Sequence, residues 1–239
     1  MNYDYAGNLE YLCNSIVPTD DDFRVAKEIM KNGCSPDGYK GFAESILRNT
    51  VQKKGTVFAI AGNIGSGKST FIHALLENNM LGSDVMPVLE DVYKTVFFDG
   101  VDNMKVAYGY AKSFVKKKIL DYCSSGKNFI YEFVPSNDEK MEILDALKSI
   151  GYRVVVLFIM TDDININVNR VKNRVASGAD FVSEDKVRSR EFLTNGNLNR
   201  LLHCSDEFYR YYSKDGSFIL RSYKVGGEEM LTVSEEMPI

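Results

Sequence analysis

A glycine-rich segment that ends in lysine, serine and threonine carries the most specific chemistry in this sequence. Its nine residues fit the phosphate-binding pattern G-x-x-x-x-G-K-[ST], and they are Gly62, Asn63, Ile64, Gly65, Ser66, Gly67, Lys68, Ser69 and Thr70. Glycines permit a tight turn in which several backbone N–H groups point at one phosphate. We therefore predict a nucleotide-binding P-loop, in which Lys68 reaches the β- and γ-phosphates and the Ser69 hydroxyl holds Mg²⁺.

The residues on both sides of this segment have the pattern that a P-loop requires. An apolar run over residues 56–61 precedes the glycines and is typical of a buried parallel strand. Apolar residues between 71 and 76 follow and predict a helix. The N-terminus of that helix would direct the positive end of its dipole at the phosphates. A chance glycine-rich turn is the alternative, and this order of elements argues against it.

Phosphoryl transfer also needs a carboxylate that orients or deprotonates the acceptor. Asp91 follows a second predicted strand, residues 84–89, and is our candidate base. The adjacent Glu90 competes with it, and a helix N-terminal charge is the structural alternative. Glu132 lies in a third apolar strand, residues 128–134, where an unpaired charge would be costly. We expect it to have a partner, either Mg²⁺ through water, a lid arginine, a substrate hydroxyl or a structural ion pair.

Four arginines are the candidates for neutralising the transferred phosphoryl group. Arg170 and Arg174 are four residues apart and share one helix face. A break at residues 177–180 separates them from a second predicted helix that carries Arg188 and Arg190. We interpret residues from about 165 to 195 as a helical lid, hinged at Gly178, that closes when ATP binds. Arg174 and Arg188 would then reach the phosphates, unless these arginines only form a solvated face.

Strand and helix patterns alternate along the chain and indicate an α/β fold, a P-loop NTPase-type doubly wound parallel sheet flanked by helices. Ligands of such sheets bind at the carboxyl ends of the strands, where the P-loop, Asp91 and Glu132 are expected. Two predicted helices, residues 20–31 and 39–51, precede the P-loop strand. We divide the chain into an N-terminal helical extension (1–54) and a P-loop kinase domain (55–239). The extension is expected to pack on the core, with a regulatory or partner-binding arm as the alternative.

The composition is that expected of a cytoplasmic enzyme. The 239 residues are 44% hydrophobic, which supports a sizeable core, and their net charge of −4 gives no general attraction to nucleic acid or membrane. Binding of nucleic acid through a local basic groove stays an alternative. We find neither a secretory signal pattern nor an apolar run of membrane-spanning length. The cysteines lack metal-ligand spacing and are expected to be reduced thiols.

From residue 126 to about 212 the chain resembles the zeta-toxin family of P-loop kinases. The resemblance runs through residues 126–132, 147–154, 169–175, 187–190 and 197–201, together with the P-loop and residues 91–94. It implies an ATP- and Mg²⁺-dependent kinase that phosphorylates a hydroxyl of a small molecule. Characterised members act on a UDP-activated amino sugar such as UDP-N-acetylglucosamine, and many are toxins with an antitoxin protein as partner.

The resemblance also implies roles for individual residues. The family's base maps onto Asp91, its strand-three glutamate onto Glu132, and its phosphate-binding lid arginines onto Arg174 and Arg188. This chain departs from the family where relatives often have Gly-Gly-His-x-Val-Pro. Residues 178–183 read Gly-Ala-Asp-Phe-Val-Ser instead, so the lid loses a histidine and a proline.

Two other functions stay open. The P-loop sequence is also common in deoxynucleoside kinases. Those kinases usually carry an acidic-Arg-Ser element after a middle strand, where this chain has Glu-Phe-Val at residues 132–134. A nucleoside or polynucleotide-end kinase is therefore the first alternative. A nucleotide-binding regulatory module without turnover is the second.

Overall fold

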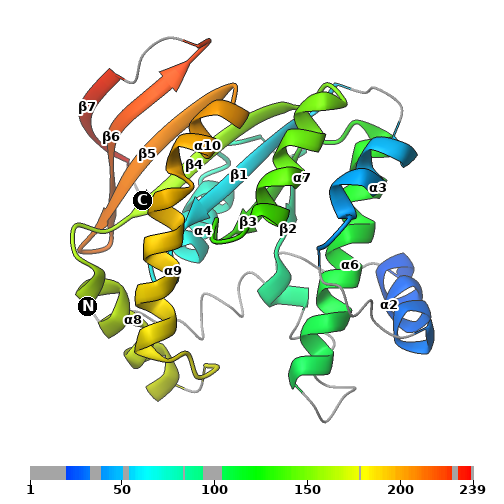
Figure 1. Cartoon of the computed structure of the whole chain (residues 1–239), viewed down its shortest axis with the longest axis horizontal. Helices are drawn as coiled ribbons and strands as arrows, with labels where there is room; N and C mark the ends of the chain where they lie inside the picture. The colour runs from blue at the N-terminus through cyan, green and yellow to red at the C-terminus, as the bar shows by residue number, and fades with distance from the viewer. Residues whose placement is uncertain are drawn as a thin grey trace.

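A computed structural model describes residues 20–32, 39–50, 54–82, 84–93, 104–177, 179–227 and 231–237 (Figure 1). Several predicted features lie outside these residues. They are the first 19 residues of the predicted extension, the turn at 33–38, Val51, Lys94 and the proposed hinge residue Gly178.

A seven-stranded sheet with the order β2-β3-β1-β4-β5-β6-β7 forms the centre of the described fold. The strands are β1 (Thr56–Gly62), β2 (Met86–Val88), β3 (Phe129–Phe133), β4 (Arg153–Met160), β5 (Glu207–Lys214), β6 (Ser217–Val225) and β7 (Leu231–Met237). Neighbours from β2 to β5 pair in parallel, whereas β6 and β7 are antiparallel additions. The predicted P-loop NTPase-type α/β fold with a doubly wound parallel sheet is confirmed.

The three C-terminal strands were not anticipated from the sequence. β5 and β6 form a hairpin whose two turn residues, Asp215 and Gly216, have φ angles of +49° and +87°. Two positive φ angles in a two-residue loop are typical of a type I′ turn, whose twist matches that of the strands. Asp-Gly is one of the sequences that this turn prefers. The sequence signal for this hairpin was therefore present and was missed.

Helices cover both faces of the sheet. They are α2 (Asp20–Asn32), α3 (Phe42–Asn49), α4 (Lys68–Glu77), α6 (Met104–Ser125), α7 (Asp138–Ser149), α8 (Ile164–Ala176), α9 (Glu184–Gly196) and α10 (Leu198–Cys204). Side chains alternate along a strand, so Ala59 and Ile60 of β1 enter different cores. Ala59 joins the core under α3, α6, α7 and α10, and Ile60 joins the core under α4, which lies behind the sheet in Figure 1. No described helix combines the length and the apolar character that a membrane span needs.

Helix α3 belongs to the main core although it precedes the P-loop strand. Its Ile46 is fully buried and its Phe42 is 4% exposed, and both join the cluster that includes α6 and α7. This packing agrees with the expectation that the N-terminal residues pack on the core. The boundary at residue 54 between an extension and a kinase domain stays a prediction.

Truncating the buried side chain of α3 should therefore destabilise the whole protein. We expect Ile46→Ala to lower the free energy of unfolding by about 2–5 kcal/mol, because it removes core contacts and leaves a cavity. Equilibrium urea unfolding measures this. Leu47→Ala on the same helix is the control, since Leu47 is 50% exposed and should change stability by less than about 0.5 kcal/mol. A separate early transition in Ile46→Ala would show instead that α3 unfolds independently of the sheet.

Candidate active site

The P-loop connects the end of β1 to the start of α4 and has the backbone of a phosphate cradle. Gly65 and Gly67 have φ angles of +77° and +103°, in the region that favours glycine. A Cβ at Gly65 would lie 2.7 Å from the Asn167 carbonyl oxygen, so α8 approaches the loop closely. Asn63 stabilises the loop, because its side-chain oxygen accepts a hydrogen bond from the Ile64 N–H at 2.8 Å.

Lys68 and Glu132 form a buried pair of opposite charges at the carboxyl ends of β1 and β3. Lys68 Nζ lies 3.9 Å from Glu132 Oε1 and donates a hydrogen bond to the Asn63 carbonyl at 3.0 Å. The two side chains are only 8% and 14% exposed. Burial lowers the pKa of the Lys68 ammonium and raises the pKa of the Glu132 carboxyl, and each effect is opposed by the charge of the other residue. The partner expected for Glu132 is thus a residue of the P-loop itself.

Glu90 and Asp91, the two adjacent candidates for the base, have different surroundings. Both lie in a helical turn at residues 90–93 that follows β2. Glu90 Oε2 accepts a hydrogen bond from the Tyr39 hydroxyl at 2.9 Å. The negative charge of Asp91 acts on the buried pair, since it raises the pKa of Glu132 and favours the charged form of Lys68. Of these two adjacent carboxylates, Asp91 is the one whose charge acts on the P-loop lysine.

The two predicted lid helices pack against the P-loop. α8 begins after Asp163, whose carboxylate accepts a hydrogen bond from the Asn165 N–H, and α9 begins after Ser183, whose side chain accepts one from the Lys186 N–H. Val187 of α9 is fully buried with valines of α8 and with the P-loop residue Ile64. In addition, the Asn63 amide donates to the Val187 carbonyl at 3.2 Å. Both helices therefore meet the loop that is expected to hold phosphate.

Among the four lid arginines, Arg170 contacts the P-loop directly and Arg174 acts on the buried pair through its charge. Arg170 Nη1 donates to the Ser66 carbonyl at 3.3 Å and to the Ser213 hydroxyl at 3.0 Å. The charge of Arg174 reaches the buried pair and lowers the pKa of both Lys68 and Glu132.

Arg188 and Arg190 have other partners. Arg188 is exposed and donates to Glu184 Oε1 at 2.7 Å and to Asn165 Oδ1 at 2.7 Å. Arg190 donates to the hydroxyl of Ser136, which lies in the segment after β3. Delivery of Arg188 to the phosphates would require its bonds to Glu184 and Asn165 to break, and it stays a prediction.

The structure also brings in residues that the sequence analysis did not select. The Tyr108 hydroxyl of α6 donates to Asp180 Oδ2 at 3.0 Å, which joins α6 to the loop between the lid helices. Burial raises the pKa of Tyr108, and the charges of Asp91 and Asp180 add to the effect. Lys140, in the first turn of α7, acts on Lys68 and Glu132 through its charge. Two of these residues had a signal in the sequence. Asp180 lies where this chain departs from the family pattern, and Lys140 follows strand three, at whose carboxyl end the site was expected. Tyr108 had no such signal.

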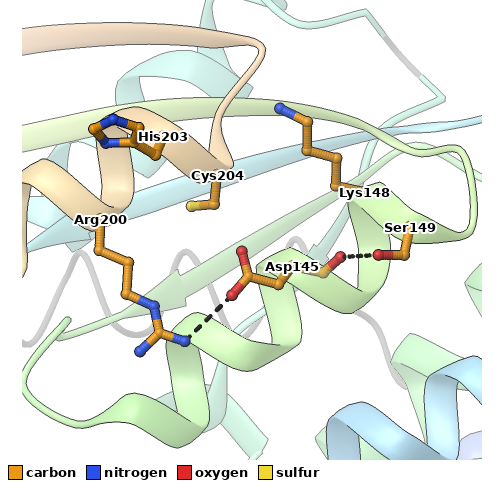
Figure 2. A pocket seen from close by; sticks show the side chains of 6 residues that line it. All are labelled: Asp145, Lys148, Ser149, Arg200, His203 and Cys204. Atoms are coloured by element: carbon orange, nitrogen blue, oxygen red, sulfur yellow. Dashed lines mark hydrogen bonds and ion pairs between the residues drawn. The ribbon is translucent and has the colours of Figure 1, made fainter.

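A shallow surface pocket of about 340 Å³ lies elsewhere, between α7 and α10 (Figure 2). Its cationic side chains are already paired. Arg200 bonds to Asp138 and Asp145, and Lys148 lies 3.0 Å from Asp206. Asp206 precedes β5, so the pocket lies at the amino ends of the strands, away from the P-loop. We assign it no part in the site.

A protein-family model matches the part of the chain that builds this site. The model of the family named Zeta toxin matches residues 43–195. The chain belongs to the zeta toxin family. The matched region contains α3 except its first residue, the P-loop, Asp91, Glu132, α8 and most of α9. It begins inside the predicted N-terminal extension, upstream of the proposed boundary.

Solved structures with the same fold include a two-protein complex and a toxin–antitoxin system. The AvrRxo1-ORF1:AvrRxo1-ORF2 complex with sulphate ions has a TM-score of 0.57 at 17% identity, over 96% of this chain and 75% of that chain. The same complex with ATP has a TM-score of 0.57 at 16% identity, over 94% and 73%. The PezAT toxin–antitoxin system of Streptococcus pneumoniae has a TM-score of 0.54 at 17% identity, over 77% and 80%. At these identities the likeness concerns the fold. No curated protein sequence matches this zeta toxin family chain.

The lid arginines should differ in their effect on ATP turnover. We expect Arg174→Ala to lower kcat about 10²–10³-fold, the scale of a lost transition-state donor, with a smaller change in ATP affinity. Steady-state turnover and ATP titration measure the two quantities. Lys172→Ala is the control, since Lys172 lies exposed on the same helix and pairs with Glu184 at 2.9 Å. Normal turnover in Arg174→Ala would show that this arginine is only part of a solvated face of the lid.

Hydrogen exchange tests the lid itself. We expect residues 165–195 to be more protected with a non-hydrolysable ATP analogue than without it, because closure would exclude water from the phosphates. Arg188→Ala, measured beside Arg174→Ala, should lose turnover only if that closure also breaks the bonds to Glu184 and Asn165. Equal protection in both states would contradict the lid.

Proposed function

We propose that this chain is an ATP- and Mg²⁺-dependent kinase. It transfers the γ-phosphoryl group of ATP to a hydroxyl of a small molecule, most directly a nucleotide sugar such as UDP-N-acetylglucosamine. The observation that carries the proposal is the buried ion pair of Lys68 and Glu132, on which the charge of Asp91 acts, in a chain of the zeta toxin family.

The residues present fit a bound nucleotide and its metal. Backbone N–H groups of the P-loop and the N-terminus of α4 suit phosphate oxygens, and the positive φ angles of Gly65 and Gly67 give the loop the tight turns that a phosphate cradle needs. Mg²⁺ prefers oxygen ligands and keeps several waters. The Ser69 hydroxyl at the start of α4 would ligate it, and the Glu132 carboxylate would hold one of its waters. The bound metal supplies positive charge that polarises the phosphoryl oxygens.

The protein side chains divide the remaining work of the transfer. Asp91 accepts the proton of the acceptor hydroxyl, and the acceptor oxygen forms a bond to the γ-phosphorus. The bond between that phosphorus and the oxygen bridging to the β-phosphate breaks, and ADP leaves. Lys68 and Arg174 neutralise the charge on the moving group, which is the largest contribution available to such a site. Arg170 holds the P-loop through the Ser66 carbonyl.

The acceptor and the partner are inferred from the family. A UDP-activated amino sugar is the acceptor that the family implies, and an antitoxin protein is the partner that fits it. The printed descriptions of the similar structures name the PezAT toxin–antitoxin system and a complex of AvrRxo1-ORF1 with AvrRxo1-ORF2. An ATP-consumption screen over nucleotide sugars, nucleosides and RNA ends tests the acceptor. Turnover with a nucleoside or an RNA end alone would favour the alternative kinase, and ATP binding without any acceptor would favour a regulatory module.

The P-loop lysine should be essential. We expect Lys68→Ala to abolish phosphoryl transfer and weaken ATP binding, because it removes the charge that faces the β- and γ-phosphates. Turnover and ATP titration measure this, and circular dichroism checks that the fold is kept. Lys117→Ala serves as the control, because Lys117 is 44% exposed on α6 and pairs only with Asp121 in the described contacts. Unchanged ATP turnover in Lys68→Ala would rule out the kinase.

The base should be Asp91 and not Glu90. Asp91→Asn is expected to keep ATP affinity and lower kcat about 10²–10⁴-fold, the usual scale for a lost general base. Glu90→Gln should stay close to the unmodified protein, because its amide oxygen can still accept the hydrogen bond from Tyr39. Rapid-quench measurement of phosphoryl transfer compares the two variants. The reverse result, with the loss in Glu90→Gln alone, would move the base by one residue.

A further inference from the structure

Tyr39 links the chain before the P-loop strand to the turn that carries the candidate base. It lies in the turn at residues 39–41 that leads into α3, and it is 4% exposed. Its hydroxyl donates to Glu90 Oε2 at 2.9 Å, across 51 residues of sequence. Glu90 immediately precedes Asp91, so this bond is one residue away from the candidate base.

The position of the Tyr39 ring is held by its neighbours. The Phe42 N–H donates to the Tyr39 carbonyl at 3.0 Å, and Gly41, at φ +68°, lets the chain turn into α3. The Tyr39 and Phe42 ring centroids are 6.2 Å apart. Lys140 Nζ lies 5.5 Å from the Tyr39 ring centroid, a cation–π distance. Because α3 packs in the main core, the hydroxyl is presented to Glu90 from a fixed support.

The Tyr39 hydroxyl is also a permanent donor. Burial raises its pKa well above the ordinary value, and the charge of Glu90 raises it further. Tyr131, 2% exposed, is a second buried phenol whose pKa is raised by burial and by Glu90. Both phenols therefore stay protonated at neutral pH, and the bond from Tyr39 to the Glu90 carboxylate is charge-assisted.

Glu90 and Asp91 belong to one short turn, so holding one carboxylate places the other. The turn is closed by the Tyr93 N–H, which donates to the Leu89 carbonyl at 3.2 Å. Without the bond from Tyr39, Glu90 would lose its partner beside a second carboxylate, and the two like charges would repel.

We propose that Tyr39 is a positioning residue for phosphoryl transfer: by holding Glu90 toward the N-terminal segment, it sets the place of Asp91 and keeps Glu90 from competing for the acceptor. The inference rests on the proposed function, in which Asp91 is the base. It implies that residues 39–50 complete the acceptor side of the site.

Tyr39→Phe in the full chain tests the proposal, since it removes the hydroxyl and keeps the ring. We expect faster hydrogen exchange of the Tyr93 amide, about tenfold if one hydrogen bond of ordinary strength is lost. With UDP-N-acetylglucosamine as acceptor, we expect kcat to fall about tenfold while the KM for ATP is unchanged. Tyr110→Phe is the matched control, because the Tyr110 hydroxyl of α6 also forms a long-range hydrogen bond with the N-terminal segment, to the Met30 carbonyl at 3.5 Å.

A double-mutant cycle shows whether Tyr39 acts through Glu90. In a Glu90→Ala background, Tyr39→Phe should have no further effect on kcat, whereas independent roles would multiply. Losses that multiply, or Tyr93 exchange equal to that of Tyr110→Phe, would overturn the proposal. If the unmodified protein does not phosphorylate UDP-N-acetylglucosamine, the proposed acceptor fails. The exchange measurement, which needs no substrate, then decides the role of Tyr39: unchanged Tyr93 exchange overturns it, and the expected increase supports it.

Discussion

The burial of Lys68 beside Glu132 is the constraint on which the rest of this site depends. The parallel register pairs Ile60 of β1 with Glu132 of β3, and this places the carboxylate next to the strand that leads into the P-loop. Two charges 3.9 Å apart and largely removed from water are costly compared with apolar side chains of similar volume. The fold accepts that cost because phosphoryl transfer needs fixed charges in a water-poor site, where they act more strongly than in solvent. The neighbouring elements are arranged around this pair.

The parts of the fold that the sequence could predict are those set by local physics. Glycine spacing, apolar runs and the break at residues 177–180 depend on a few adjacent residues, and the P-loop, the parallel strands and the lid helices followed from them. The Asp215-Gly216 hairpin was equally local, and its two-residue turn signal was missed. The contacts that define the site are different in kind. Tyr39 meets Glu90 and Tyr108 meets Asp180 across 51 and 72 residues, so only the tertiary arrangement brings them together.

The lid arginines illustrate the same limit. Residues 170, 174, 188 and 190 are of one type and lie on two consecutive helices, and sequence alone could not separate them. The structure separates them by what each helix faces. α8 lies with Asn167 against the P-loop and directs Arg170 at the Ser66 carbonyl. α9 meets the P-loop through a backbone carbonyl, that of Val187, while Arg188 bonds back to Glu184 in the turn before it. Family resemblance maps a residue onto a role, and packing decides whether its side chain is in place to perform it.

The cations and the carboxylates of the candidate site come from different elements. Cations from the P-loop and α8, namely Lys68, Arg170 and Arg174, gather where phosphates are expected. Tyr39 and Tyr108 donate hydrogen bonds to two carboxylates, Glu90 and Asp180. Asp180 occupies the position where relatives often carry a histidine, so a residue that can donate a proton or carry positive charge is replaced by an anion, and Tyr108 is its hydrogen-bond donor. The charge of Asp91 acts on both phenols, so these carboxylates and their phenol donors lie near the candidate base. Carboxylates accept hydrogen bonds from the hydroxyl-bearing part of a molecule and repel its phosphates. For the nucleotide-sugar acceptor that we propose, the sugar would therefore face Asp91 and the phosphates would be turned away from Asp180.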